Sequence, residues 1–132
     1  MGTYLTAILL DTHTLLWWLG NRALLSDGAR TIIEDHGNRA FVSAATAWEI
    51  AIKNRLGKLR AREILADFER VLEEEGFSQL AITTAHALHA GSMKSANQDS
   101  FDQLLAAQAQ LENIPIISAD KFFDRQGVKR IW

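Results

Sequence analysis

Four acidic residues stand beside apolar segments of this chain in positions that would bring their carboxylates together. Asp11 and Asp120 each follow a short apolar run, and Asp102 stands in the first turn of an expected helix. Glu49 lies about two helical turns beyond a third apolar run. Because ligands of open parallel sheets bind beyond the carboxyl ends of the strands, these acids would meet there if the Asp102 helix docks at that edge.

A group of four carboxylates indicates metal chemistry. Carboxylates that share a pocket repel one another, so they need a counter-ion or raised pKa values. Oxygen ligands suit a hard divalent cation, and Mg²⁺ or Mn²⁺ fits best. Such a cluster is typical of phosphodiester hydrolysis, in which the metal lowers the pKa of an attacking water. The pattern leaves open whether one ion or two are bound.

Each of these acids also has a purely structural explanation. Asp11 and Asp120 could cap the helical turns that follow them. Glu49 stands three residues after Thr46, which is the spacing of a capping box. Asp102 would be favoured in a first helical turn by the helix dipole. The spacing alone leaves the two explanations evenly balanced.

The segments that would position the acids alternate between short apolar runs and helical patterns. We expect a buried parallel sheet covered by helices on both faces. Ser100 is predicted as the N-cap of a helix, with Gln103 completing a capping box, and residues 91–99 as a loop. Strands are expected at 7–10, 40–43, 79–82, 115–118 and 128–132, helices at 14–19, 24–35, 44–56, 63–75, 84–90 and 101–112, and a helical turn at 121–125.

Length and composition limit the class of protein. The 132 residues fit one domain, 1–132. The formal charge of −2 shows no basic excess, so any nucleic-acid contact needs a local patch. The absence of cysteine excludes disulfides, thiolate nucleophiles and zinc–thiolate sites, and fits a cytoplasmic protein. Since no apolar run approaches the ~18 residues of a membrane span, we expect no membrane association.

Four segments around the acids carry a more specific signal. They read LLDTHTLLW at 9–17, VSAATAWEIAIK at 42–53 with GKL at 57–59, DSFDQLLAAQA at 99–109, and IISAD at 116–120. In this order they resemble the four motifs of PIN-domain ribonucleases of the VapC toxin type. The resemblance covers nearly the whole chain, and four motifs in order are far more specific than any one.

The resemblance implies a fold, an activity and a set of site residues. The implied fold is a three-layer α/β/α sandwich with a central parallel sheet. The implied activity is that of a Mg²⁺- or Mn²⁺-dependent endoribonuclease, the toxin of a type II toxin–antitoxin pair. Asp11, Glu49, Asp102 and Asp120 fall on the acidic positions of the family, where they would act as metal ligands and catalytic residues.

Further residues fall beside these acids in the motifs. Asp99 matches another acid of the third motif. Thr12 and Ser118 match small polar positions, where hydrogen bonds would orient the carboxylates. His13 follows Asp11 closely and is expected to approach the site.

The third motif departs from the family pattern at three positions. Where the pattern often has His, Pro and Arg, this chain has Asn97, Ser100 and Gln103. Loss of the histidine and the arginine would alter substrate binding or the stabilisation of charge in the transition state. The acids are retained, so we expect metal binding to remain, in an enzyme of full, weakened or specialised activity.

The resemblance also implies partners. RNA is the implied substrate, and a small antitoxin would wrap the chain and block the acidic site. A homodimer is expected, with an exposed aromatic such as Trp17 or Trp18 at an interface. DNA would be contacted only indirectly, through the antitoxin, which agrees with the net charge.

A basic stretch begins one helical turn after the acid of the second motif. It could hold RNA phosphates beside the metal site, or contact the antitoxin. It could equally be a solvated helix end, where cations favour the dipole. Its members are Lys53, Arg55, Lys58, Arg60 and Arg62.

The aromatic residues and the remaining histidines are mostly expected to be structural. Trp48 has helical spacing with apolar neighbours and is predicted to lie in the core. Trp17 and Trp18 are adjacent, so we do not expect both to face the core. His86 and His89 are predicted to pack or to lie on the surface, because a zinc pair would need further ligands.

Two other functions remain open. The chain could be a catalytically weak PIN-like protein that acts mainly by binding an antitoxin, which the altered third motif favours. It could also be a phosphotransfer domain that uses Asp11 as phosphoacceptor, although the matching acid pair and lysine are not found.

Overall fold

A computed structural model describes residues 6–94 and 99–132, which form a five-stranded sheet in which every pairing is parallel. The strand order is β3-β2-β1-β4-β5, so β1 lies at the centre. This confirms the predicted parallel sheet. The strands are β1 (Thr6–Leu10), β2 (Asn38–Ser43), β3 (Ser78–Leu80), β4 (Ile116–Ile117) and β5 (Arg130–Ile131).

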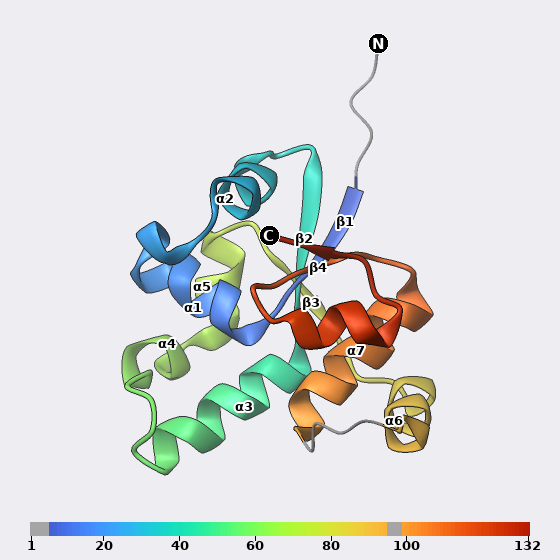
Figure 1. Ribbon diagram of the computed structural model, residues 1–132. Coiled ribbons are helices and arrows are strands. Elements are labelled where there is room, and N and C mark those ends of the chain that lie inside the picture. The colour runs from blue at the N-terminus through green and yellow to red at the C-terminus, as the bar shows by residue number, and fades with distance from the viewer. Residues whose placement is uncertain (1–5, 95–98) are drawn as a thin grey trace.

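Helices cover both faces of this sheet, as a three-layer α/β/α fold requires. Figure 1 shows α1, α2, α4 and α5 on one side and α6, α7 and η2 on the other. The helical elements are α1 (Thr12–Gly20), η1 (Arg22–Leu24), α2 (Asp27–Glu34), α3 (Ala44–Arg55), α4 (Arg62–Ala66), α5 (Phe68–Glu74), α6 (Thr84–Ser92), α7 (Ser100–Glu112) and η2 (Lys121–Gln126).

The last three residues of the central strand β1 are apolar because both faces of the strand are buried there. Side chains alternate across a strand, so Ile8 and Leu10 enter one core while Leu9 enters the other. All three side chains are fully buried. Each contributes about 1.5–3 kcal/mol by leaving water, so β1 joins the two cores into one stable unit.

The register of the sheet determines where the site forms. Leu10, the last residue of β1, pairs with Val42 of β2 on one side and with Ile117 of β4 on the other. The residues that come directly after Leu10, Val42 and Ile117 therefore lie side by side. They are Asp11, Ser43 and Ser118.

Two predicted helices differ from the observed elements. The helix expected at 24–35 is a 3₁₀ turn, η1, followed by α2, which begins after Ser26 because the Ser26 hydroxyl caps the Ala29 N–H. The helix expected at 63–75 is broken at Asp67, whose φ of −152° and ψ of 65° are not helical. Leu65 and Leu72 still pack on the same core from either side of the break.

The start of α7 also corrects a prediction. Asp99, not Ser100, is its N-cap: the Asp99 carboxylate accepts hydrogen bonds from the N–H groups of Phe101 and Asp102, at 2.9 and 3.1 Å. Ser100 is exposed and stands inside the helix, so the capping box predicted with Gln103 is wrong. The remaining predicted boundaries differ from the observed ones by no more than two residues.

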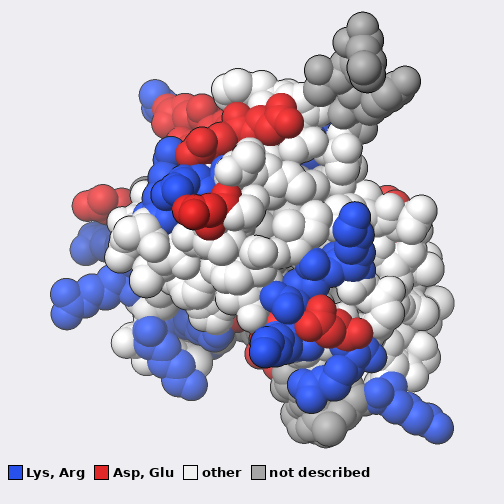
Figure 2. Space-filling view, turned by 45° about the horizontal axis from the view of Figure 1, so that its top comes forward, with Lys and Arg blue, Asp and Glu red and all other residues white. Residues whose placement is uncertain are grey.

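The charges on the surface are mixed. Figure 2 shows acidic side chains lying among lysines and arginines, with no single large basic area on that face. None of the helices in the described part of the chain has the length and apolar character needed to cross a bilayer.

Candidate active site

Asp11 is the most enclosed acid of the site. It is 5% exposed and caps α1, since its Oδ1 accepts a hydrogen bond of 2.7 Å from the Thr14 N–H. Its Oδ2 accepts a hydrogen bond from the Ser118 hydroxyl. Burial raises the pKa of Asp11, while these hydrogen bonds act in the opposite direction. The capping role of Asp11 is therefore compatible with a role as a metal ligand, because capping fixes the orientation of the carboxylate.

Ser118 joins two of the predicted acids. Its side chain is fully buried at the end of β4, where its hydroxyl donates to Asp11 and accepts from the Asp120 N–H at 3.0 Å. Asp120 is exposed and caps η2, because its Oδ1 accepts from the Phe122 N–H at 2.9 Å. A single serine thus sets the spacing between Asp11 and the loop that carries Asp120.

Glu49 is held on α3 by two side chains. It is 3% exposed, and it accepts hydrogen bonds from the Thr12 hydroxyl at 2.6 Å and from Lys53 Nζ at 2.5 Å. The Thr46 hydroxyl lies 3.1 Å from that of Thr12. The capping-box reading of Thr46 and Glu49 is wrong, because Ser43 caps α3 and Thr46 is buried inside the helix.

Asp102, in the first turn of α7, has a pKa that is shifted by the other acids. Its pKa is raised to about 7, first because of burial and then because of neighbouring negative charges. In order of decreasing effect, these charges are Asp99, Asp120, Glu49 and Asp11. The fold therefore brings the other four predicted acids within electrostatic reach of Asp102.

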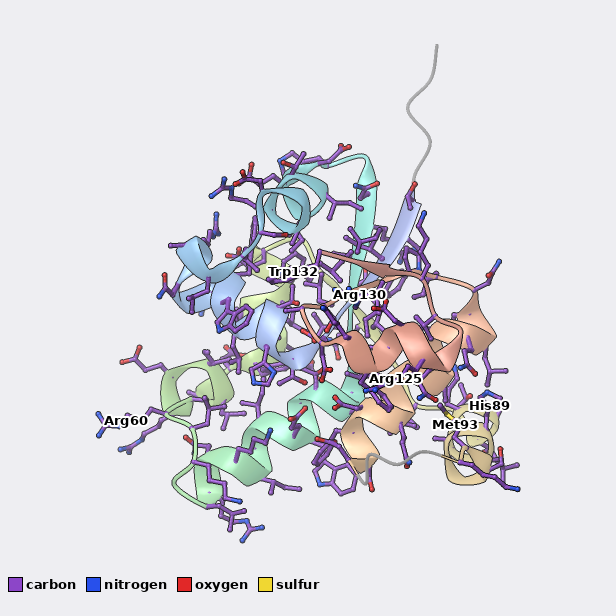
Figure 3. The ribbon with its side chains drawn as sticks, viewed as in Figure 1. Arg60, His89, Met93, Arg125, Arg130 and Trp132 are labelled. Atoms are coloured by element: carbon purple, nitrogen blue, oxygen red, sulfur yellow. The ribbon has the colours of Figure 1, made fainter. Side chains whose placement is uncertain are left out.

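Lys53 is the basic residue that contacts an acid of this group. Its pKa is raised, chiefly by the hydrogen bond to Glu49 and against the effect of its own burial, with smaller contributions from Asp99 and Asp102. The ammonium group thus offsets part of the negative charge. The rest of the predicted basic stretch is exposed, and Figure 3 shows Arg60 extending away from the body of the molecule. Its other members are Arg55, Lys58 and Arg62.

The donor set fits a hard divalent cation, although no complete ligand cage is formed in advance. Within residues 6–94 and 99–132, no three His, Cys, Asp or Glu side chains have the spacing of a metal site. Mg²⁺ keeps several of its waters and usually takes one or two protein carboxylates, so a closed cage is not required. Burial and then repulsion by the other acids raise the pKa of Asp102, and a bound cation would offset that repulsion.

A small pocket opens directly beside the acids. It has a volume of about 280 Å³ and is lined by Asp11, His13, Trp17, Ala119 and Asp120. The expectation that His13 approaches the site agrees with this position. His13 is exposed, and its charge acts to lower the pKa of Asp11.

The prediction that Trp48 is a core residue is wrong. It is 57% exposed, and its ring meets the edge of Phe101 at a centroid distance of 5.1 Å. The helical spacing of Trp48 placed it on the rim of the buried face of α3 rather than within it. Trp18 is buried and Trp17 partly exposed, as expected of adjacent residues.

His86 and His89 agree with their predicted structural role. His86 is buried, and its Nδ1 accepts a hydrogen bond of 3.0 Å from the Thr83 N–H. His89 shares a hydrogen bond of 2.5 Å with the side chain of Gln110.

Arg130 is a supporting residue that the sequence did not reveal. It binds both carboxylate oxygens of Asp124, at 2.9 and 3.1 Å, and donates to the Ser118 carbonyl at 3.1 Å. Figure 3 shows Arg130 beside η2. No local pattern predicts this contact, because it depends on β5 pairing with β4.

Two of the three departures in the third motif lie in the described residues. Ser100 is exposed at the start of α7, and Gln103 is partly buried one turn later. Asn97 lies outside the described residues.

Comparisons with known proteins agree with this architecture. The family model described as "PIN domain" matches residues 8–129. The protein named Ribonuclease VapC16, from Mycobacterium tuberculosis, is 44% identical over 62 residues, which are 46% of this chain and 43% of that protein. The chain thus matches less than half the length of this relative.

Several solved structures have a similar fold. One is VapBC2 from Rickettsia felis bound to a DNA fragment from its promoter, with a TM-score of 0.64, 14% identity, and coverage of 95% of this chain and 97% of that one. Another is VapBC-1 from nontypeable Haemophilus influenzae, with a TM-score of 0.66, 17% identity, and coverage of 95% and 96%. A third is a toxin–antitoxin complex from Klebsiella pneumoniae, with a TM-score of 0.55, 19% identity, and coverage of 86% and 87%.

Proposed function

Because the chain belongs to the PIN-domain family, we propose that it is an endoribonuclease that hydrolyses RNA phosphodiester bonds with the aid of Mg²⁺ or Mn²⁺. The observation that carries this proposal is the gathering of carboxylates around Asp102 at the carboxyl edge of the sheet. The similarity to a protein named as a ribonuclease supports RNA as the substrate.

The four acids would coordinate the metal together. We assign the principal ion to Asp11 and Asp102, with Glu49 and Asp120 assisting. The bound ion would lower the pKa of an attacking water and offset negative charge on the phosphate.

The residues around the acids prepare them for this role. Ser118 and Thr14 hold both oxygens of Asp11, so that carboxylate cannot rotate freely. Thr12 and Lys53 hold Glu49 in the same way. These contacts limit the entropy that the side chains lose when a cation is bound.

The protonation state of Asp102 would change when a cation binds. With a pKa of about 7, its carboxyl carries a proton in a large share of molecules at neutral pH. That proton leaves when a cation takes its place, because a ligating carboxylate must be ionised. Cation binding would therefore release protons near neutral pH.

We further propose that the chain is the toxin of a toxin–antitoxin pair and forms a homodimer in the cytoplasm. Similar folds occur in a structure described as a toxin–antitoxin complex and in VapBC assemblies, which supports a protein partner. Contact with DNA would be made only through the antitoxin, in line with the mixed surface charge.

The decisive test is cleavage of total cellular RNA by the purified chain, free of antitoxin. Reactions would contain Mg²⁺, Mn²⁺ or chelator, and would compare the native chain with Asp11→Asn. We expect discrete fragments that need the metal and disappear in Asp11→Asn. Asp27→Asn is the matched control, since that side chain is 95% exposed on α2.

One alternative is favoured by specific observations. The absence of a preformed ligand set in the described residues, together with Ser100 and Gln103 in the third motif, suits a catalytically weak protein that acts by binding an antitoxin. Titration calorimetry separates the two functions. Metal binding with cleavage supports the nuclease, and the absence of both supports the binding protein.

A further inference from the structure

We propose that the pocket beside the acids holds one nucleobase of single-stranded RNA, stacked against His13 and Trp17. Given the ribonuclease function proposed above, the base would belong to a nucleotide next to the phosphate that lies at the carboxylates. The pocket would then fix the position of the strand during cleavage.

The composition of the pocket carries this inference. One wall comes from α1, with His13 and Trp17, and the other from the loop after β4, with Ala119 and Asp120. Asp11 lies at the same pocket. An aromatic wall and two of the site acids therefore line one hollow, and a strand with its phosphate at the acids has a neighbouring base within reach of the rings.

The size of the pocket suits a single base. Its volume of about 280 Å³ is close to the lower end, about 300 Å³, of pockets that hold small organic molecules. Ala119 is small and exposed, so the loop side leaves room for a flat ring to enter.

Trp17 is fixed before any ligand arrives. Its ring centroid lies 5.8 Å from that of His13 and 5.7 Å from that of Trp132, with interplanar angles of 45° and 56°. Figure 3 shows Trp132 close to α1, and both tryptophans pack against the core. A ring that is already ordered loses little conformational entropy when a base stacks on it.

The polar edges of these rings are available to a ligand. In the part of the chain that the structure describes, no hydrogen bond is made by the imidazole of His13 or the indole N–H of Trp17. Proteins recognise unpaired RNA bases by stacking them on aromatic side chains and by hydrogen bonding to their edges. The pocket offers both kinds of contact.

The test measures RNA binding separately from cleavage. A short fluorescein-labelled single-stranded RNA and an abasic oligomer of the same length are titrated by fluorescence anisotropy. The buffer contains chelator and has a pH below 7, so that Asp102 is largely protonated and no metal is present. The proteins compared are the native chain, Trp17→Leu, His13→Ala and Trp48→Leu, in which Trp48 is an exposed tryptophan outside the pocket.

We expect Trp17→Leu to weaken binding of the intact RNA on the order of 10-fold, the effect of losing one stacked base. His13→Ala should act in the same direction, and since His13 is exposed, this variant does not depend on the folding of Trp17→Leu. Binding of the abasic oligomer should not change in either variant. Trp48→Leu should leave the ratio of the two affinities as in the native chain.

Other results would overturn the pocket assignment. Equal weakening of both oligomers, or no weakening of either, means that no base stacks there. If Trp17→Leu alters binding of the antitoxin but not of RNA, the pocket is a protein contact. If either of these results is found and the native chain still cleaves RNA, only the base pocket is refuted. If the pocket variants weaken binding of the intact RNA but no metal-dependent cleavage is found, the nuclease function is refuted and the base pocket is retained.

Discussion

At the scale of single residues, the charge of Asp102 links the site to stability. The carboxyl has an ordinary pKa of 3.8 and a folded-state pKa of about 7, so the folded chain binds this proton more tightly than the unfolded chain does. Its contribution to the free energy of unfolding is therefore complete below pH 3.8 and is lost as the pH rises through 7.

It follows that Asp102→Asn stabilises the metal-free protein increasingly as the pH rises toward 7. The uncharged amide avoids both burial of a charge and repulsion by the other acids. Thermal unfolding in chelator across this pH range measures the difference. Asp27→Asn should show no such growth, and a difference between Asp102→Asn and native protein that is independent of pH would contradict the assignment.

A second prediction concerns Ser118, whose hydroxyl binds both Asp11 and the backbone of Asp120. Loss of a hydrogen bond that orients a metal ligand typically costs about 10–100-fold in metal affinity or activity. We expect Ser118→Ala to weaken Mg²⁺ binding in calorimetry by that factor. Ser92→Ala is a suitable control because Ser92 is exposed on α6. Unchanged affinity in Ser118→Ala would exclude this role.

Some residues of the site could be predicted from the sequence, and others could not. The site acids, Thr12 and Ser118 stand in local motifs, so their placement near one another was predictable, while their chemical roles stay a prediction. Arg130 and the exposure of Trp48 were not predictable. Arg130 acts through a pairing of distant strands, and the exposure of a residue at the rim of a helix face depends on which helix packs beside it.

At the scale of elements, α7 carries two acids with different tasks. Asp99 lies ahead of the helix and binds its first N–H groups, while Asp102 lies within the first turn and is affected by the charges of the other acids. The capping-box pattern of Ser100 and Gln103 predicted the helix but placed the cap at Ser100. Serine and aspartate cap about equally well, so their order in the chain could not decide between them.

Substitution of the two neighbours separates these assignments. Asp99→Ala should lower the free energy of unfolding by about 0.5–2 kcal/mol, the usual cost of a lost N-cap. Ser100→Ala should have little effect, because Ser100 is exposed and does not cap. Urea denaturation of both variants is measured well below pH 7, where Asp102 is protonated and is not repelled by Asp99. The reverse order of stabilities would restore Ser100 as the cap.

At the scale of the whole molecule, the site is assembled from separate parts of the chain. Its acids follow β1 and β4 and stand on α3 and α7, and only the sheet and its packing bring them together. The alternation of apolar and helical segments predicted the parallel sheet. The strand order β3-β2-β1-β4-β5 did not follow from it, because pairing between distant strands leaves no local signature.

Metal binding should therefore stabilise the molecule as a unit. A ligand that binds only the folded state adds RT ln(1 + [L]/Kd) to the free energy of unfolding. We expect Mg²⁺ to raise the midpoint of thermal unfolding and to slow amide hydrogen exchange in β1, β4, α3 and α7 together. Asp11→Asn should remove both effects. Slowed exchange in α7 alone would mean that the ion is held by one element.

The hydrogen bond between Ser118 and Asp11 spans 107 residues, which has a consequence for synthesis. At about 5–20 residues per second, a ribosome adds Ser118 roughly 5–20 s after Asp11. Until then, the central strand β1 lacks its neighbour β4, and one side of the acidic site is missing. A nascent chain therefore cannot complete the site before Ser118 and Asp120 have been added, and whatever chemistry the acids perform begins only after that.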